Sequence, residues 1–177
     1  MPKTTADVGM LTAVETQMCN YPGSMGMQHW YRAFVTLPDA PTSYVQIELY
    51  DKVGAFAGGT VRTGSFPVDT DPATCGVCVR GMGDKGATDA KEYFATTGTV
   101  TISAIGGNMA TLTATLSNIG FVELDKNRHL VSGGCMATFA AGQISGTVVQ
   151  KGGMGGGSGS GGGGGGGGGM CAQTVGD

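Results

Sequence analysis

The stretch TGTVTISAI (97–105), with Gly106-Gly107-Asn108 and MATLTATLS (109–117) after it, decides the fold class of this chain. In both flanking segments an aliphatic residue alternates with threonine or serine, which is the period of a strand with one buried face. The residues between the segments tolerate the positive φ angles of a tight turn. The sequence therefore predicts an antiparallel β-hairpin with its threonines facing solvent.

The same alternation recurs in SYVQIELY (43–50), where valine, isoleucine and leucine fill every second position. Two elements with one aliphatic face each predict a shared core. The alternation of the hairpin is expected to continue through Ile119 and Phe121 after a bulge at Gly120. The residues that we expect in the core are Val45, Ile47, Leu49, Val100, Ile102, Leu112 and Leu116.

Other segments extend the β pattern. QHWYRAFVTL (28–37) is rich in aromatic and β-branched residues, and CMATFAAGQISGTVVQ (135–150) predicts one long strand or two short ones. DKVGAFAGGTVRTG (51–64) predicts a turn, a short strand and another turn. Only DAKEYFA (89–95) has helical leanings, and it is too short for a stable helix. Strands without alternating helices predict an all-β fold, an antiparallel β-sandwich or barrel, with a C-terminal polyglycine extension.

Composition divides the chain into three parts. Residues 1–151 are expected to form the β-sandwich domain, and residues 170–177 are expected to be an anchoring segment. Between them lies the tract 152–169, in which 15 of 18 residues are glycine. A tract without side chains cannot join a core and is entropically costly to order, so a flexible linker is one interpretation.

A second interpretation is that another subunit orders the tract. Glycine adopts an extended helix of three residues per turn, and the missing Cβ atoms allow such helices to pack closely. Copies of the chain itself are then the expected partner. The residues expected to carry this assembly are Gly155, Gly156, Gly157, Gly161, Gly165, Gly169, Met170 and Cys171.

The charge content excludes several classes of partner. The 177 residues suffice for one domain with a core, yet only 13% of them are charged and the net charge is −3. Ten lysines and arginines, scattered along the chain, do not form the basic surface that nucleic acid requires. The apolar runs are too short for a membrane span, and residues 1–17 lack the apolar region of a signal peptide.

Five cysteines, spread along the chain, favour a disulfide framework over a cytosolic metal cluster. They are Cys19, Cys75, Cys78, Cys135 and Cys171. We expect two disulfides, with Cys75 and Cys78 joined to distant partners or to each other, and one thiol that is free or intermolecular. Together with the low charge, this pattern predicts an extracellular or cell-surface protein.

Several segments resemble a group of uncharacterised exported proteins of gliding and predatory deltaproteobacteria, many of them lipoproteins. They are YVQIELYDKVGAFAGGTVRTGSF (44–66), ATCGVCV (73–79), TGTVTISA (97–104), TLTATLSNIGFVELD (111–125) and GGC (133–135). The resemblance spans roughly residues 19–140 and excludes the polyglycine tract. It implies a secreted β-sandwich with disulfides and without an established activity. The chain departs from this group because it shows no signal or lipid-attachment segment.

The Cys75-Gly-Val-Cys78 pair matches the pattern of dithiol oxidoreductases, in which the first cysteine lies at the start of a helix. The following VRGMGDKG (79–86) is a poor helix, which disfavours a redox site. With Cys135 and Cys171 the pair would supply four zinc ligands, but a second closely spaced pair is missing. Structural disulfides are therefore the favoured interpretation.

Two patterns are candidates for metal binding. Met25, Met27 and His29 offer soft ligands at alternate positions, which suit Cu(I), although ten methionines make such a pattern common in this chain. Asp69 and Asp71 offer oxygens to calcium, but an Asx-turn is favoured there because further carboxylates are missing. No cofactor is expected.

The sequence contains no catalytic constellation. Its histidines, His29 and His129, have no nucleophile motif beside them, and nothing pairs Glu48 with Glu123 as two acting carboxylates. The threonines of the hairpin suit a solvated strand face better than an array that binds ice or a crystalline polymer. The sequence therefore predicts a non-catalytic exported structural protein, a subunit of an extracellular fibre, sheath or matrix. The alternative is a monomeric secreted module that binds a surface glycan or a metal ion.

Overall fold

The computed structural model describes residues 4–6, 9–12, 15–23, 26–37 and 40–151, and among them the side chains of residues 29–37 and 42–151. The strands that precede the first long loop are β1 (Thr4–Ala6), β2 (Gly9–Thr12), β3 (Glu15–Gly23), β4 (Gly26–Leu37) and β5 (Ala40–Tyr50). The later strands are β6 (Gly64–Pro67), β7 (Val77–Gly83), β8 (Lys91–Ala104), β9 (Thr111–Glu123), β10 (Met136–Thr147) and β11 (Val149–Gln150). One 3-10 turn, η1 (Gly54–Phe56), lies between β5 and β6.

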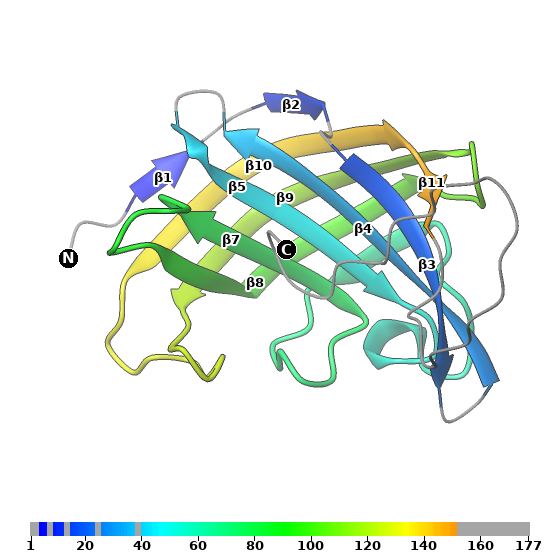
Figure 1. The fold of residues 1–177 in the computed structure, drawn as a ribbon, viewed down its shortest axis with the longest axis horizontal. Coiled ribbons are helices and arrows are strands. Elements are labelled where there is room, and N and C mark those ends of the chain that lie inside the picture. The colour runs from blue at the N-terminus through cyan, green and yellow to red at the C-terminus, as the bar shows by residue number, and fades with distance from the viewer. Residues whose placement is uncertain (1–3, 7–8, 13–14, 24–25, 38–39, 152–177) are drawn as a thin grey trace, which may run out of the picture.

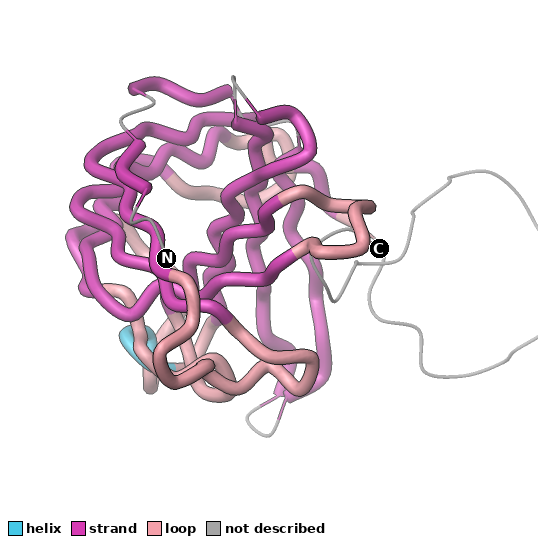
Figure 2. Tube along the Cα trace, turned by 90° about the vertical axis from the view of Figure 1, so that its left-hand side faces the viewer, coloured by secondary structure: helices cyan, strands magenta, loops and turns pink. Residues whose placement is uncertain are grey.

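All of these strands belong to one sheet, whose order is β1-β10-β9-β8-β7-β5-β4-β3-β11. The sheet curls into a half-barrel, with β3, β4, β5 and β7 across the front and β8, β9 and β10 behind them (Figure 1). The side view shows the strands bending around a common interior (Figure 2). The long strands pair antiparallel, so the predicted all-β antiparallel fold is confirmed, as a single curled sheet.

The predicted hairpin is confirmed as β8 and β9. Val100 pairs with Leu116 and Thr101 with Thr115, so the aliphatic and the hydroxyl side chains of both strands share their faces. The register shifts on both sides of the Thr97–Gly120 pair, so the expected irregularity at Gly120 is present, and it extends to Asn118, whose φ is +53°. Asparagine tolerates this left-handed conformation. Gly120 lies against Thr97, whose hydroxyl would have to move to admit a Cβ at this position.

The core fills the inside of the curled sheet. All seven predicted core residues are buried, and Ile119 and Phe121 join them. Further buried aliphatic residues come from the odd-numbered positions of β4, β5 and β7, because alternate residues of a strand point to the same face. Phe56, Val61 and Val68, from the segments around η1 and β6, complete the cluster.

One local expectation is wrong, that of a short strand within 51–64. The segment 89–95, which was not expected to form a stable helix, is mostly part of β8, where Lys91 pairs with Gly83 of β7. Its weak helical preference is overridden because pairing with a neighbouring strand satisfies its backbone groups. The segment 51–64 contains the η1 turn in place of a short strand, and β6 begins only at Gly64. The segment 135–150 forms two strands, β10 and β11.

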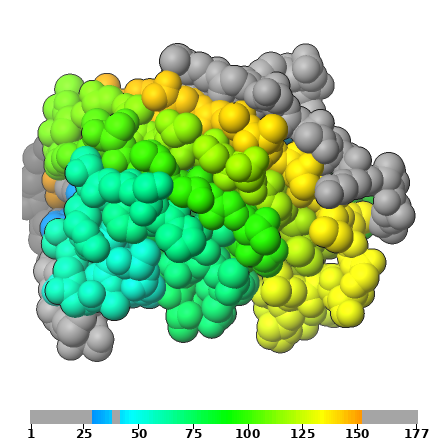
Figure 3. Space-filling view, turned by 180° about the vertical axis from the view of Figure 1, so that it is seen from behind, coloured from blue at the N-terminus to red at the C-terminus, as the bar shows by residue number. Residues whose placement is uncertain are grey.

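The parts of β6, β8, β9 and β10 formed by residues 64–67, 99–104, 111–117 and 141–147 contain no charged residue, and their outer face carries hydroxyl and amide groups. These strands lie side by side in the rear view (Figure 3). Ser65 contacts Thr101 at 2.9 Å, and Thr113 contacts Ser145 at 3.0 Å, so the hydroxyls bond to each other across the strands. The described part of the chain includes no helix with the length and hydropathy that a membrane span requires.

Candidate ligand-binding cleft

A cleft of about 650 Å³ opens between two loops. One loop (68–76) leads from β6 to β7, and the other (124–135) leads from β9 to β10. Arg80 on β7 lies between them, on the outer face of the sheet. The residues that line the cleft are Thr70, Asp71, Pro72, Ala73, Arg80, Asn127, Arg128, His129 and Leu130. A volume of this size lies within the range of small-molecule sites.

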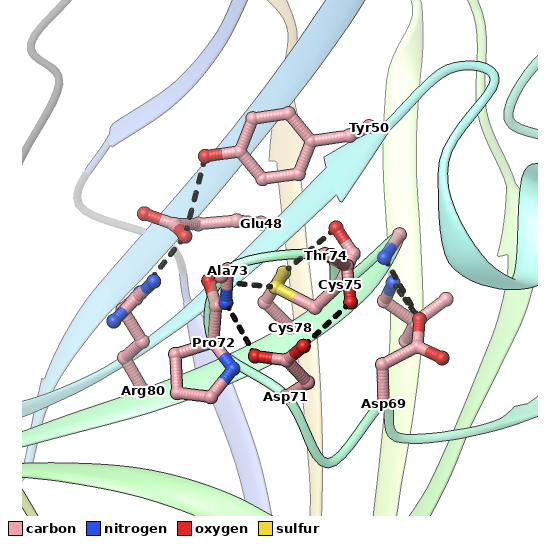
Figure 4. Close-up of a disulfide and its surroundings, with 12 residues drawn as sticks. Glu48, Tyr50, Asp69, Asp71, Pro72, Ala73, Thr74, Cys75, Cys78 and Arg80 are labelled. Atoms are coloured by element: carbon pink, nitrogen blue, oxygen red, sulfur yellow. Dashed lines mark hydrogen bonds and ion pairs between the residues drawn. A yellow bond between two sulfur atoms is a disulfide. The ribbon is translucent and has the colours of Figure 1, made fainter. Parts of the chain in front are cut away.

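The 68–76 loop is held in place by two aspartates (Figure 4). Oδ2 of Asp69 accepts hydrogen bonds from the backbone N–H groups of Gly76 and Val77, at 2.8 and 2.9 Å. Asp71 accepts from the N–H of Ala73 and from the hydroxyl of Thr74, both at 2.9 Å. These bonds lower the pKa of Asp71, the bond from Ala73 being the larger cause. The Asx-turn expected from the sequence is therefore present.

Gly76 brings this loop close to the segment around η1. A Cβ at Gly76 would collide with the carbonyl oxygen of Val53, so only glycine fits here without a shift of the backbone. Gly54 on the other side has a φ of +49°. The two glycines let the loop lie flat against its neighbour, which fixes the wall of the cleft.

The 124–135 loop is organised around Asp125. Its Oδ1 accepts from the N–H groups of Asn127 and His129 at 2.8 and 2.9 Å, and its carbonyl accepts from the N–H of Arg128. The hydrogen bond from the N–H of His129 is the largest cause of the lowered pKa of Asp125. Arg128 has a φ of +63°, which this tight turn imposes. Four consecutive residues of this turn, Asn127 to Leu130, line the cleft.

The Cys75–Cys78 disulfide lies beneath both loops. The two cysteines pair with each other, with their Cα atoms 5.5 Å apart, which is one of the alternatives that the sequence left open. Both are buried and pack with Phe94 and Leu124 in a small cluster separate from the main core. Leu124 is the first residue of the 124–135 loop, and Cys75 lies near the end of the 68–76 loop. The disulfide therefore packs against residues of both loops that form the walls of the cleft.

Arg80 is fixed by its contacts along the sheet. Its Nε donates to Oε2 of Glu48 at 3.0 Å, and its Nη1 donates to Oε1 of Glu92 at 3.3 Å. Its guanidinium also lies over the ring of Phe94, 5.2 Å from the centroid. Glu48 is buried and accepts from Tyr50 and Gln46 as well, so the carboxylate is fully engaged (Figure 4). Arg80 thus presents a positioned charge on the floor of the cleft.

Arg128 and His129 supply the exposed polar groups of the cleft. The Arg128 side chain is 45% exposed, and its Nε lies 3.9 Å from Oε2 of Glu92. His129 is 79% exposed, and its ring lies 3.8 Å from Asp125. Both contacts are longer than hydrogen bonds, so these side chains keep donors for a ligand.

The other predicted cysteines have different outcomes. Cys135 has a free thiol, half-buried, which accepts a hydrogen bond from Nζ of Lys91 at 3.3 Å. The same Nζ lies 2.8 Å from Oε1 of Glu123, whose Oε2 accepts from the backbone N–H of Cys135. The side chains of Cys19 and Cys171 lie outside the described residues, so the second predicted disulfide stays a prediction.

The candidate metal ligands are not brought together as one cluster. Met25 and Met27 lie outside the described side chains. Nδ1 of His29 lies 2.9 Å from Oδ2 of Asp51, a buried carboxylate that also accepts from the N–H of Val61. Asp69 and Asp71 hold their own loop, as described above. Among the described residues, no three histidine, cysteine, aspartate or glutamate side chains form a metal-ligating group. The assembly residues predicted in 155–171 also lie outside the described part of the chain.

Sequence reasoning missed the cleft. It singled out Asp71 and His129, but for calcium and for catalysis, and it did not connect the loops that carry them. The segment DKNRH (125–129) begins with an aspartate before a polar turn, much like DTDPAT (69–74), and this shared pattern was the available signal. Comparison with known proteins adds nothing, since no family model, curated protein or solved structure matches the chain.

Proposed function

We propose that this chain is a non-catalytic, extracellular binding module and that the cleft holds a glycan. The observation that carries the proposal is the convergence of Thr70, Arg80, Asn127 and His129 on one cleft of about 650 Å³. Hydroxyl, guanidinium, amide and imidazole groups bond well to sugar hydroxyls, which both donate and accept. Pro72 and Leu130 add apolar surface for the C–H face of a sugar ring.

The two loops supply the rigidity that such binding requires. A loop that is ordered before the ligand arrives loses less conformational entropy on binding. Asp69, Asp71 and Asp125 hold the loop backbones by hydrogen bonds, and the Cys75–Cys78 disulfide adds a covalent link. The described cleft residues do not pair a nucleophile with a base, and the proposal assigns them to recognition alone.

The proposal is tested with a glycan array probed by the full chain, followed by titration calorimetry with each glycan that binds. Asn127→Ala removes a lining amide and should weaken binding about fivefold, the effect of one hydrogen bond. Ser132→Ala, in the same loop but outside the cleft, is the matched control and should leave binding unchanged. Absence of binding to every glycan, or equal loss in both variants, contradicts the proposal.

A second candidate function is that of a subunit in an extracellular fibre or matrix. The observation that favours it is the uncharged hydroxyl face formed by residues 64–67, 99–104, 111–117 and 141–147 of β6, β8, β9 and β10, where copies would meet without charge repulsion. Thr101→Lys places a charge on this face and should reduce assembly, measured by electron microscopy and sedimentation. Ala87→Lys, in an exposed loop, is the control. Uniform monomers of the unmodified chain at high concentration, under non-reducing conditions, contradict this function.

A further inference from the structure

We propose that the ligand of the cleft is anionic, a glycan that carries a carboxylate or a sulfate group, and that Arg128 and Arg80 hold this group. The inference rests on the proposed glycan-binding function and adds the chemical class of the ligand. Carboxylate and sulfate share the same requirement, since both present two or more oxygens to a guanidinium fork.

The lining residues favour a negative ligand by their charge. They carry two guanidinium groups and one carboxylate, that of Asp71. Both oxygens of that carboxylate accept hydrogen bonds from the 68–76 loop itself, from Ala73 and Thr74. The lining carboxylate is therefore used within the protein, whereas the donor-bearing side chains of Arg128 and His129 are 45% and 79% exposed. A ligand that brings acceptors is the complement of such a lining.

The two guanidinium groups are brought together by one carboxylate. Nη1 of Arg80 lies 3.3 Å from Oε1 of Glu92, and Nε of Arg128 lies 3.9 Å from its Oε2. Glu92 is not a lining residue, so it neutralises part of the charge from outside the cleft. Arg80 is also paired with Glu48, whereas Arg128 contacts Glu92 only at 3.9 Å, so the Arg128 guanidinium has donors left for a second anion.

The two arginines differ in how firmly they are held, which divides their roles. Arg80 is clamped by Glu48 at 3.0 Å and by the ring of Phe94, so its charge has a fixed place. The Arg128 side chain is 45% exposed and sits on a turn whose backbone is fixed by Asp125. Arg128 therefore makes the direct contact, and Arg80 supplies a fixed charge beneath it. His129 and Asn127 stand next to Arg128 in the lining and offer donors to neighbouring hydroxyls.

The test compares ligands that differ only in charge. A tetrasaccharide of galacturonic acid, its sulfated galactose analogue and the neutral galactose tetrasaccharide are titrated into the full chain at low and high salt. We expect the acidic ligands to bind about tenfold tighter than the neutral one, the effect of a charge-assisted hydrogen bond. We also expect this advantage to shrink at high salt. The ratio between the carboxylated and the sulfated ligand identifies the preferred group.

Arg128→Asn is the decisive variant, because asparagine tolerates the positive φ of this position and the turn should keep its shape. It should abolish the advantage of the acidic ligands and leave the affinity for the neutral one within about twofold. Lys126→Gln removes the same charge from the same loop, outside the lining, and serves as the control. Arg128→Lys, which keeps the charge, covers the case in which the asparagine variant does not fold, and should restore only part of the advantage.

The outcomes separate the two proposals. Equal binding of acidic and neutral ligands overturns this inference and leaves the proposed glycan binding intact. An equal effect of the Arg128 and Lys126 substitutions overturns it as well, because the effect is then one of net charge. Absence of binding to all three ligands and to the wider glycan array overturns the proposed function, and this inference with it.

Discussion

Nε of Arg80 lies 3.0 Å from Oε2 of Glu48, and both side chains are almost completely buried on the outer face of the sheet. The pair joins β7 to β5 directly beneath the cleft. A buried ion pair adds little to stability compared with well-packed apolar residues. Removing one partner, however, leaves the other charge buried without a counter-charge. Glu48 therefore fixes the position of the Arg80 guanidinium at the floor of the cleft.

The first prediction concerns this pair. Glu48→Ala leaves the Arg80 guanidinium buried with only the weaker contact to Glu92. We expect the free energy of unfolding to fall by about 3–5 kcal/mol, measured by urea denaturation. Asp89→Ala, an exposed carboxylate removed from a loop, should change it by less than about 0.5 kcal/mol. A loss below about 1 kcal/mol for Glu48→Ala would show that solvent or another residue satisfies Arg80.

The second prediction tests the register of the hairpin. Leu116 is fully buried and pairs with Val100, whereas Thr113 lies on the opposite face. Leu116→Ala leaves a cavity and should cost about 2–5 kcal/mol, and Thr113→Ala should cost less than about 1 kcal/mol. Both are measured by denaturant unfolding. The opposite ranking would mean a register shifted by one residue.

The third prediction concerns the oxidation state of the cysteines. Thiol titration of the denatured, unreduced protein should find no more than one free thiol per chain, and Cys135 is the residue that supplies it. The Cys75–Cys78 bridge closes a very short loop, so replacing both cysteines by serine should cost only about 2 kcal/mol. Four or five free thiols would contradict the disulfide and the extracellular location proposed from it.

The same bridge should couple the two walls of the cleft. In the double serine variant we expect faster hydrogen exchange in 70–74 and also in 125–130, because the bridge packs against Leu124. Exchange in the β8–β9 hairpin is the internal control and should not change. Faster exchange in 70–74 alone would mean that the bridge supports only its own loop.

The fourth prediction is a dependence of stability on pH. The hydrogen bond from Lys91 and, second, that from the backbone N–H of Cys135 lower the pKa of Glu123 from 4.5 to about 2. The folded pKa lies below the unfolded one, so this carboxylate contributes stability above pH 4.5 that is lost as the pH falls towards 2. The melting temperatures of the unmodified protein and of Glu123→Gln should differ most near neutral pH.

The difference in melting temperature between the unmodified protein and Glu123→Gln should shrink as the pH falls from 4.5 towards 2. Asp71 and Asp125 also have a lowered pKa, so both proteins lose stability in acid, and the comparison isolates the part due to Glu123. The pKa of Lys91 is raised by the same pair, and its contribution is lost only above pH 10.5. A difference that stays constant down to pH 2 would contradict the pairing of Lys91 with Glu123.

The hairpin, the core and the all-β class could be predicted because they depend on local alternation. Val100 and Leu116 face the core wherever β8 and β9 pair, since the strand period alone decides it. The Cys75–Cys78 bridge was within reach for a similar reason, because two residues between cysteines allow them to meet. The irregularity around Gly120 was expected, whereas the part played by Asn118 was not, because asparagine as well as glycine tolerates such a conformation.

The cleft could not be predicted, because it depends on residues far apart in the sequence. Arg80 and Arg128 share Glu92 only after β7, β8 and β9 have paired in register. No local pattern marks Arg80 either, since it occupies an outward position of a strand that is covered by two loops. Tertiary placement, and not composition, turns these residues into a candidate site.

The short strands at the ends of the sheet have a consequence for how copies of this protein meet. β10 is flanked by β1 and β2, of three and four residues, and β3 is flanked by β11, of two. A long exposed edge is a template onto which a strand of another molecule adds, and such short strands are poor templates. Strand addition, the route that leads to amyloid, is therefore discouraged along β10, where β1 and β2 pair with residues 137–139 and 142–145. Among the described residues, β11 pairs only with Gln17 and Met18 of β3, so β3 is the edge that a strand of another copy would meet first.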